Sequence, residues 1–540
     1  MLIGYVSDER YVAIADALVE FERDGRSVAV VRSTPRGGIY TDLEPGRYRV
    51  TLVRDGFGSK HVELDIEPVS PPHQFRLLSD CLLGYVWPKW VHSGQRSEFR
   101  VQAVEPYKLT LWRYGLRKEF VKLLGWFDEH GPRAVMQITP DGDYTQTGVG
   151  WNKIGYGNPH ITQFVTGPDR SGLYYLEAKT ESGRFFSFPW IVAPAAPSAS
   201  VAVVMSTNTW NAYNNFGGRS NYVNSTGLPP TPAVNARLDQ TRYTNAGVFR
   251  EWSARDDAYP PLSFERPEPC NHIAEGTDVT DPIAGRQQCH LAPAEWRLLA
   301  WLEREEIGHD VYSESQLHDG SLDLDAYRVL MISTHPEYWS HDMYFRVKTW
   351  VHERGGRFMY LGGNGLNCEV VFLDPDRIKF NNYMADEGGA FRYYDSELGR
   401  DIDSRMDRTV ESEANLLGVA MTETGIMTSA PYRAIEPDHW VFDGTRLESG
   451  DLFGTESLHE RCPGGASGHE TDKMSPASPK ETVLLAKGTN PDDGGAEMTI
   501  YELANGGAVF SAGSITYPAA LLVDRAISRI TKNVLDRFLS

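Results

Sequence analysis

The chain has 540 residues, of which 41% are hydrophobic and 23% charged, and this ordinary composition excludes a disordered or fibrous protein. At roughly 150 residues per domain, the length suggests three or four domains. The 73 acidic and 53 basic side chains give a formal net charge of -20. Because this charge repels phosphate backbones and anionic lipid surfaces, neither nucleic acid nor a membrane is an expected partner.

The absence of targeting features and the cysteine pattern both favour the cytoplasm. No stretch approaches the ~18 consecutive apolar residues of a membrane span, and the polar start, MLIGYVSDERY, lacks the features of a signal peptide. The five cysteines are an odd number scattered along the chain, which does not suggest a disulfide framework. We therefore expect a cytoplasmic protein with reduced thiols.

The first 70 residues predict a small β-sandwich. Short β-rich runs at residues 17–21, 28–32 and 47–53 alternate with turn signals, and the last of them alternates apolar with polar side chains. The segment TDLEPGRYRVTLVRDGFGSKHVEL, residues 41–64, places a turn glycine before a Tyr-x-Val strand. In this it resembles the carboxypeptidase regulatory-like domain.

Residues 71–193 predict a second β-domain, either a sandwich or a lectin-like fold. Strand-like segments with interleaved aromatic residues fill this region, and no long amphipathic helix interrupts them. Residues 194–200, PAAPSAS, then form a linker that prolines stiffen and that offers little to fill a core.

From residue 201 to 540 the pattern predicts an α/β domain with a mainly parallel sheet. The predicted strands are residues 201–205, 327–332, 357–361 and 509–512, and the predicted helices are 293–306, 341–354 and 521–539. Ser340 is the expected N-cap of the second helix, and Gly355 and Gly356 end it. A strand, helix, strand order of this kind implies parallel pairing, as in the glutamine-amidotransferase-like folds that it resembles.

In such open sheets the active site lies beyond the carboxyl ends of the strands. Four loops at those positions are rich in polar and aromatic residues: NTWNAYNNFGG at 208–218, HPEYWS at 335–340, GGNGL at 362–366 and GSITY at 513–517. Tyrosine, tryptophan, histidine and asparagine suit a pocket better than an exposed loop. The first three loops are therefore the leading candidates for a site.

The GGNG segment stands where a strand-to-helix elbow projects one residue into the cleft. That residue is Asn364, which has no nucleophilic hydroxyl or thiol and can only donate and accept hydrogen bonds. Cys368 follows four residues later, and we expect it to be packed rather than reactive.

HPEYWS places His335 and Glu337 two residues apart. Glu337 could bind a metal ion that His335 helps to orient, or the two could act as an acid and base pair. Alternatively, both could merely cap the following helix.

Two further motifs are ambiguous. Cys270 and His272, taken with Cys289 and His290, have the composition of a zinc site but not the usual spacing. GHETD at 468–472 lies in a loop rich in glycine, serine and proline, where residue chemistry alone makes Glu470 a solvated charge.

Six motifs in order resemble the C-terminal domain of the large (beta) subunit of N,N-dimethylformamidase. They are NTWNAYNNFGGRSNY at 208–222, SFERP at 263–267, HPEYWS, GGNG, GHETD and GSITY. The resemblance runs from about residue 201 to the C-terminus.

The resemblance implies an amide hydrolase with a mononuclear ferric iron (Fe3+) held by two tyrosines and one glutamate. Glu337 matches the glutamate ligand, and Tyr213 or Tyr222 fits the first tyrosine. Tyr259 is the candidate for the second, although Glu268 follows SFERP where relatives often carry an aromatic residue.

Three other residues match the family's polar pocket. His335 and Asn364 match pocket residues, and Glu470 matches a second carboxylate beside the metal, which replaces its reading as a solvated charge. In this scheme a metal-activated water attacks a small N-substituted amide such as dimethylformamide or a related compound. Glu470 shuttles the proton and Asn364 stabilises the oxyanion. We expect its loop to desolvate Glu470 and raise the pKa of the carboxyl.

The formamidase pairs its large chain with a small subunit, so a small subunit is an expected partner here, and we also expect a homo-oligomer. The main alternative function is a non-catalytic ligand- or carbohydrate-binding protein with an amidotransferase-like domain. A thiol hydrolase that uses Cys368 and His335 is a third hypothesis.

Overall fold

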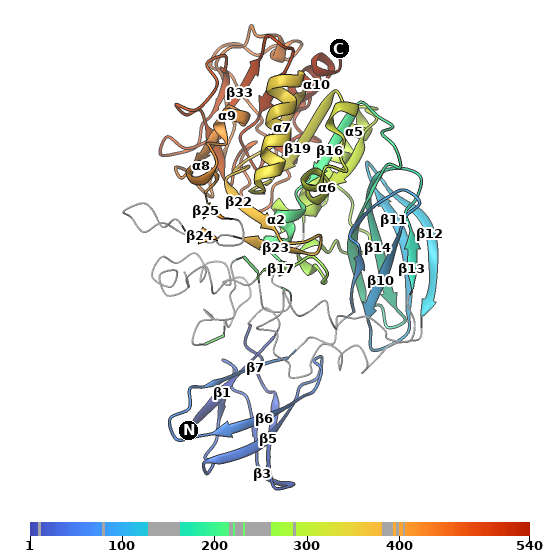
Figure 1. Ribbon diagram of the computed structural model, residues 1–540, viewed down its shortest axis with the longest axis vertical. Helices are drawn as coiled ribbons and strands as arrows, with labels where there is room; N and C mark the ends of the chain where they lie inside the picture. The colour runs from blue at the N-terminus through green and yellow to red at the C-terminus, as the bar shows by residue number, and fades with distance from the viewer. Residues whose placement is uncertain are drawn as a thin grey trace.

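The computed structural model describes residues 1–8, 12–77, 82–127, 163–214, 216, 220–221, 231–232, 261–283, 288–380, 393–395, 399–402 and 405–540. This part of the chain is rich in β-structure and contains several separate sheets. Figure 1 shows the N-terminal strands at one end of the molecule and the largest sheet, with its helices, at the other.

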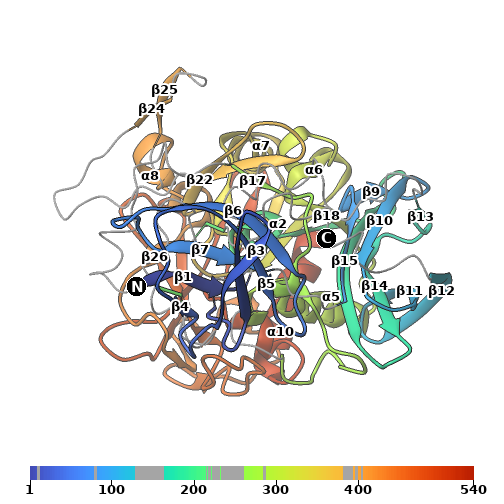
Figure 2. The same ribbon diagram turned by 90° about the horizontal axis from the view of Figure 1, so that it is seen from below.

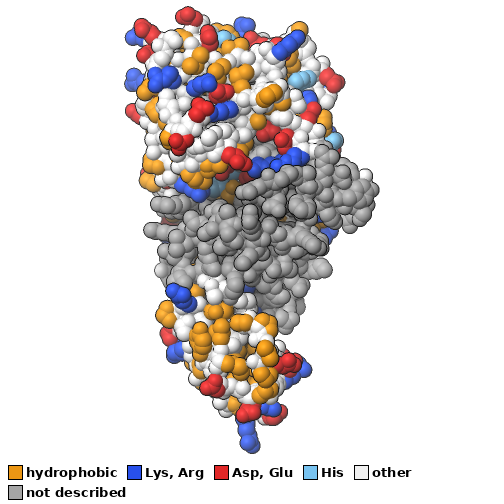
Figure 3. All heavy atoms as spheres, turned by 90° about the vertical axis from the view of Figure 1, so that its left-hand side faces the viewer, with side chains coloured by type: hydrophobic (Ala, Val, Ile, Leu, Met, Phe, Trp, Pro, Cys, Tyr) orange, Lys and Arg blue, Asp and Glu red, His pale blue; other side chains and the backbone are white. Residues whose placement is uncertain are grey.

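The N-terminal strands form a β-sandwich, as predicted. One sheet has the order β4 (Gly38–Tyr40), β1 (Leu2–Ser7) and β7 (His73–Arg76), and the other has the order β3 (Arg26–Arg32), β2 (Leu18–Arg23), β5 (Gly46–Val53) and β6 (Lys60–Ile66). Side chains of both sheets, such as Val6, Val50 and Phe75, share one buried cluster. Figure 3 shows hydrophobic side chains gathered on one face of this end of the molecule. The likeness to a carboxypeptidase regulatory-like domain stays a prediction.

A second pair of sheets follows. The smaller sheet has the order β13 (Phe164–Thr166), β10 (Arg96–Gln102) and β8 (Leu83–Trp87), and the larger has the order β12 (Lys118–Phe127), β11 (Tyr107–Tyr114), β14 (Gly172–Thr180), β15 (Phe185–Ala193) and β9 (Trp90–His92). The fully buried Trp190 joins them, because its Nε1 donates to Ser97 Oγ at 2.9 Å. This arrangement agrees with the predicted second β-domain.

Strands β14 and β15 of the larger sheet are buried on both faces. On its outer face Tyr114 stacks on Tyr175, with ring centroids 4.2 Å apart, and lies 4.8 Å from Trp296 of helix α5 (Ala292–Arg304). Figure 2 shows β14 and β15 beside this helix. The second sandwich is therefore packed against the C-terminal part of the chain. The domain boundaries at residues 70, 193 and 201 stay predictions.

The C-terminal part is built on a nine-stranded sheet. Its order is β18 (Asp310–Ser313), β16 (Val201–Met205), β19 (Val329–Thr334), β21 (Arg357–Gly362), β34 (Ala508–Ser511), β33 (Glu497–Glu502), β32 (Val483–Gly488), β28 (Tyr432–Ala434) and β29 (Leu452–Phe453). The first five strands are parallel to one another, and each later pairing is antiparallel.

The prediction of a mainly parallel sheet is therefore wrong for half of the sheet. Short connections such as residues 503–507, between β33 and β34, allow only antiparallel neighbours, because a parallel crossover needs a dozen or more residues. A glutamine-amidotransferase-like domain is not supported for this mixed sheet.

Helices cover both faces of the sheet. Alternate residues of β16 belong to two buried clusters: Val203 packs with α5 and α10 (Arg525–Leu539), and Val204 packs with α6 (Glu314–Asp319) and α7 (His341–Arg354). The described residues also contain helices α2 (Thr207–Ala212), α8 (Met406–Thr409) and α9 (Ala414–Leu417), with 3-10 turns η6 (Pro269–Asn271), η7 (Gln288–His290), η8 (Leu324–Ala326), η9 (Trp440–Phe442) and η10 (Tyr517–Ala520). In the described part of the chain, no helix has both the length and the apolar character needed to cross a membrane.

Small sheets complete the C-terminal part. A four-stranded sheet has the order β17 (Leu262–Ser263), β23 (Arg377–Phe380), β22 (Cys368–Phe372) and β20 (Tyr338–Trp339). Three two-stranded sheets pair β24 (Tyr393–Asp395) with β25 (Arg400–Ile402), β26 (Ala420–Thr422) with β31 (Thr471–Lys473), and β27 (Ser429–Ala430) with β30 (Ser467–Gly468).

The predicted helix signals agree with the structure at α7 and shift at α10. Ser340 caps α7 by accepting from Met343 N at 3.3 Å, and Gly355 ends it in the left-handed region with φ 78°. The last helix begins at Arg525 rather than at residue 521, because Asp524 caps it by accepting from Ala526 N and Ile527 N, both at 3.0 Å.

We expect Asp524→Ala to lower the thermal unfolding midpoint of the C-terminal part. The substitution leaves two N–H groups of α10 without their acceptor, which typically costs about 1 kcal/mol. Asp536→Ala, on the exposed side of the same helix, is the matched control, because its pair with Lys532 is solvent-screened and contributes little. Equal midpoints for the two variants in differential scanning calorimetry would contradict the capping role.

Candidate active site

The candidate site lies where three neighbouring parallel strands end. Tyr213 follows α2, which begins just after β16; His335 and Glu337 follow β19; and Asn364 follows β21. These strands are adjacent in the order β16, β19, β21, so their carboxyl ends meet at one edge. Glu470 reaches the same place from the short connection between β30 and β31.

Two carboxylates share one imidazole at the centre of the site. His335 Nε2 lies 3.2 Å from Glu337 Oε2 and 3.2 Å from Glu470 Oε2. Asn364 Nδ2 donates to Glu470 Oε2 at 2.8 Å, and Tyr213 Oη donates to Glu337 Oε2 at 3.5 Å. We call these five residues the carboxylate cluster.

The carboxylate cluster is buried, so its charged groups shift one another's pKa values strongly. The His335 side chain is 1% exposed, and those of Glu337 and Glu470 are 9% and 15% exposed. Burial by itself lowers the pKa of His335, but the two carboxylates outweigh burial and raise it. The imidazole is therefore held toward its charged form.

The two carboxylates differ in their proton affinity. Burial raises the pKa of Glu337 despite the opposing effect of His335. Burial also acts to raise the pKa of Glu470, but hydrogen bonds from His335 and Asn364 outweigh it and lower the pKa below the ordinary value. The prediction of a raised pKa at Glu470 is therefore wrong, because it counted desolvation without these two donors.

The Asn364 side chain is held in one orientation. Its Oδ1 accepts from Asn367 Nδ2 at 2.6 Å, so the amide nitrogen faces Glu470. The backbone N–H of Asn364 donates to Asp472 Oδ1 at 2.8 Å, and Tyr360 Oη donates to Asp472 Oδ2 at 2.7 Å. These contacts tie the loop after β21 to the segment that carries Glu470.

The backbone next to the cluster is strained. Thr334, Asn364 and His469 have φ values of 66°, 48° and 66°, in the left-handed region that residues with side chains rarely adopt. Each is, or directly precedes, a residue of the cluster. Strain of this kind persists only where the surrounding structure enforces it, and it concentrates at functional sites.

Two buried glutamates that the sequence analysis did not single out hold α2 in place. Glu295 accepts from Ser206 N at 3.0 Å and from Trp210 Nε1 at 2.7 Å. Glu314 accepts from Asn208 N at 2.7 Å. Burial raises the pKa of Glu295 to about 7. Acidic residues near helix starts are common, so the sequence contains no signal that these two are buried.

The remaining predicted residues are placed as follows. Tyr222 and Tyr259 lie outside the described residues. Cys368 contacts the cluster, with its Sγ 3.8 Å from Glu337 Oε1, and burial together with this carboxylate raises the pKa of the thiol. Ser514, in the fourth predicted loop, accepts from Gly468 N at 2.8 Å and thus supports the connection that carries Glu470.

The structure does not gather Cys270, His272, Cys289 and His290, the residues with the composition of a zinc site, into one cluster. His272 Nδ1 instead accepts from Ser187 N at 3.0 Å, and Cys270 Sγ donates to Trp210 O at 3.8 Å. His290 lies beside the carboxylate cluster, with its ring centroid 4.5 Å from that of Tyr213 and 5.4 Å from that of His335.

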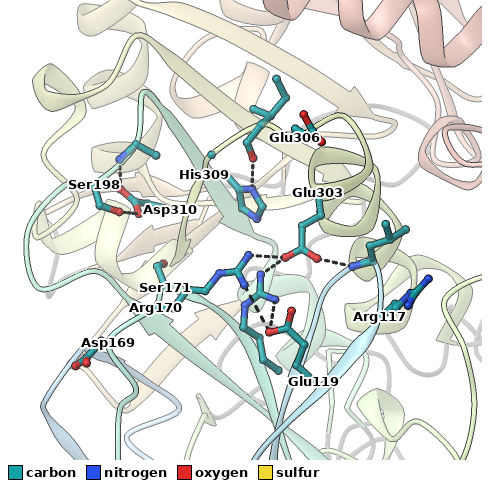
Figure 4. Close-up of a pocket in the computed structure, with 15 residues that line it drawn as sticks. Arg117, Glu119, Asp169, Arg170, Ser171, Ser198, Glu303, Glu306, His309 and Asp310 are labelled. Carbon is teal, nitrogen blue, oxygen red and sulfur yellow. Dashed lines mark hydrogen bonds and ion pairs between the residues drawn. The ribbon is translucent and has the colours of Figure 1, made fainter.

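A cavity of about 600 Å³ lies away from the cluster, between the second sandwich and the large sheet. Figure 4 shows that Arg170 and Glu303 line it, and Arg170 Nη2 pairs with Glu303 Oε1 at 3.0 Å. Arg113 pairs with the same glutamate oxygen. Because its walls are occupied by these ion pairs, the cavity marks the seam between the two parts rather than the candidate site.

Comparison with known proteins identifies the family. Residues 121–530 match the family model described as N,N-dimethylformamidase beta subunit-like, C-terminal, and the chain belongs to this family. It is 29% identical over 300 residues to the N,N-dimethylformamidase beta subunit of Paracoccus aminophilus, and 28% identical over 299 residues to that of an Alcaligenes species. Each match covers 46% of this chain and 37% of the relative, so the chain spans well under two thirds of these relatives.

Three solved structures give weak matches, each over 35% of this chain. They are E. coli alpha-2-macroglobulin (TM-score 0.12, 11% identity, 11% of that chain) and the fibronectin(III)-like modules of Clostridium thermocellum CbhA (0.11, 11%, 87%). The third is the Down Syndrome Cell Adhesion Molecule, with a TM-score of 0.12 and 12% identity over 23% of that chain.

We expect Gly363→Ala to disturb the position of Glu470. A Cβ at Gly363 would lie 2.4 Å from Glu470 O and 2.6 Å from Ile515 N, which are backbone atoms that cannot rotate away. The variant should unfold at a lower temperature than the parent. Gly308→Ala, whose Cβ would meet nothing closer than 3.9 Å, is the control and should match the parent. If both variants unfold like the parent, the loop after β21 and the Glu470 segment are not closely packed.

Proposed function

We propose that this chain hydrolyses the C–N bond of a small N-substituted amide, such as dimethylformamide or a related compound. The observation that carries this proposal is the pair of glutamates, Glu337 and Glu470, each 3.2 Å from His335 Nε2 at the strand ends. Membership of the dimethylformamidase beta subunit-like family supports it. The direct test is release of amine from dimethylformamide and from larger N-substituted amides by the purified protein.

The described residues fit a hard metal ion. Tyr213 Oη and Glu337 Oε2 lie 3.5 Å apart, and phenolate and carboxylate oxygens are the donors that ferric iron prefers over zinc. We propose Glu337 as an iron ligand, with Tyr213, or alternatively Tyr222, as the first tyrosine and Tyr259 as the second. When bound, iron would polarise the amide carbonyl and make water a stronger nucleophile.

Glu470 is suited to move the proton. Its lowered pKa keeps it as a carboxylate, which can accept a proton from the attacking water as the oxygen bonds to the carbonyl carbon. The same carboxyl can then protonate the leaving nitrogen as the C–N bond breaks, which yields a carboxylic acid and an amine. His335, held toward its charged form between the two carboxylates, keeps Glu470 in position.

Asn364 is suited to stabilise negative charge on the carbonyl oxygen. One of its two amide hydrogens is donated to Glu470, and Asn367 fixes the orientation of the amide. Asn364 Nδ2 also lies 3.4 Å from His335 Nε2, but that nitrogen faces two carboxylates and therefore carries a proton, so it is a poor acceptor for the second hydrogen. That hydrogen remains available to a developing oxyanion.

A partner subunit is part of this proposal. The relatives are named beta subunits, which implies a multi-subunit enzyme in their case. We propose that a small subunit accompanies this chain and that the chain also forms a homo-oligomer. Light scattering of the chain, alone and with a co-expressed small subunit, measures its homo-oligomeric state and its binding to the small subunit.

The thiol hypothesis has little physical support. Burial and the Glu337 carboxylate raise the pKa of Cys368, so the thiolate that such a mechanism needs is disfavoured. His335 Nε2 is already engaged by two carboxylates. It is therefore not placed as a base for the thiol.

We expect Glu337→Gln to lose bound iron while the fold stays intact. A neutral amide replaces an anionic oxygen ligand and binds a trivalent ion much less strongly. Metal analysis and loss of the tyrosinate-to-iron charge-transfer band would report this, with circular dichroism as the check on folding. Iron content equal to that of the parent would remove Glu337 from the ligand set.

We expect Glu470→Gln to keep iron and the charge-transfer band but to lower kcat by ~100-fold or more, because general acid-base catalysis contributes on that scale. Glutamine keeps the size of the side chain and an oxygen that can accept from Asn364. Two other results are informative: loss of iron would make Glu470 a ligand, and full activity would leave it without a catalytic role.

We expect Cys368→Ser to hydrolyse amides at nearly the rate of the parent, because no thiolate takes part in the proposed chemistry. Steady-state kinetics, together with the metal content of the variant, are the measurements. Loss of activity with the metal still bound would restore the thiol hypothesis.

A further inference from the structure

A thiol and two imidazoles meet beside the carboxylate cluster. Cys289 and His290 lie in η7, and His469 lies between β30 and β31, some 180 residues further along the chain by their numbering. Each offers one ligand atom, and these atoms all lie within 4.8 Å of one another. The three residues are 0%, 1% and 2% exposed. We call them the thiol-imidazole trio.

His290 supplies an independent sign that a ligand is needed there. Neither of its ring nitrogens has a hydrogen-bond partner among the described residues, although the side chain is 1% exposed. Buried polar groups are normally paired, since burying one without a partner is unfavourable. A cation bound by the three residues would coordinate one of these nitrogens and so reduce the free-energy cost of burying the imidazole.

We propose that Cys289, His290 and His469 form a second metal site, which binds a divalent ion of intermediate softness such as Zn²⁺. Thiolate and imidazole are both ligand types that zinc takes, whereas the carboxylate cluster offers hard oxygen donors. On binding, the thiol proton leaves to solvent and a metal-sulfur bond replaces the S–H bond, so no oxidant is needed.

The site would hold the Glu470 segment to the start of α5. His469 directly precedes Glu470, while Cys289 and His290 lie just before Leu291, the N-cap of α5. The ring centroids of His290 and His469 are 5.3 Å apart, and His459 lies behind His469 with its Nε2 3.4 Å from His469 Nδ1. A metal ion would thus link two segments that meet only in the folded chain. This proposal does not depend on amide hydrolysis.

The test uses Co²⁺ as a visible substitute for Zn²⁺ on the full-length chain. The parent should bind about one equivalent and show a thiolate-to-cobalt charge-transfer absorption. Cys289→Ser should lose this absorption. Cys270→Ser, which removes a buried cysteine outside the trio, should keep it. A parent without the absorption, or an unchanged absorption in folded Cys289→Ser, would overturn the proposal.

Two further variants secure the result. His290→Gln keeps the size of the side chain and should weaken Co²⁺ binding at least tenfold, which tests the site even if Cys289→Ser fails to fold; unchanged affinity would count against it. Glu337→Gln should keep the thiolate-to-cobalt absorption while it loses iron. Loss of both signals in this variant would mean one shared site and would refute a separate second site.

Discussion

The imidazole of His335 lies between two buried carboxylates, and the rest of the candidate site depends on this contact. Without a positive group between them, Glu337 and Glu470 could not both stay ionised in a buried space. The imidazole sits 3.2 Å from each, which lowers the pKa of Glu470 and leaves that of Glu337 raised by burial. Because Asn364 also donates to Glu470, the two neighbouring glutamates differ in proton affinity, and this difference would allow them separate roles.

This arrangement needs a rigid frame, and buried polar contacts supply it. Asp472 accepts from both Asn364 N and Tyr360 Oη, which fixes the loop after β21 against the segment of Glu470. Glu295 and Glu314 accept from the backbone at the start of α2, and Tyr213 directly follows this helix. Each of these buried carboxylates has hydrogen-bond donors, so its burial does not leave an unpaired polar group. The same hydrogen bonds fix the positions of the loops that they join.

Two groups of potential metal ligands lie side by side in this chain. Phenol and carboxylate oxygens gather around Glu337, whereas sulfur and imidazole nitrogen gather around Cys289, with the rings of His290 and His335 5.4 Å apart between them. Metal ions are selected in part by donor softness, so neighbouring sites with different donors need not compete for one ion. The segment of His469 and Glu470 contributes to both groups, which makes its position important to each.

The sequence alone determined the local features: the Ser340 cap, the Gly355 end of α7, the strand-rich N-terminal region and the loops at the ends of β16, β19 and β21. Each of these rests on patterns within a few residues, and parallel strands then bring their carboxyl ends to one edge. Residue chemistry could not place Glu470, because hydrogen bonds from His335 and Asn364, more than 100 positions away, decide its environment. Likewise, His272 accepts a hydrogen bond from Ser187 N. The residue that lies beside Cys289 and His290 is His469, which is far away in the sequence. The tertiary structure also decided that half of the large sheet is antiparallel. Long-range contacts settle such pairings, and no local pattern encodes them.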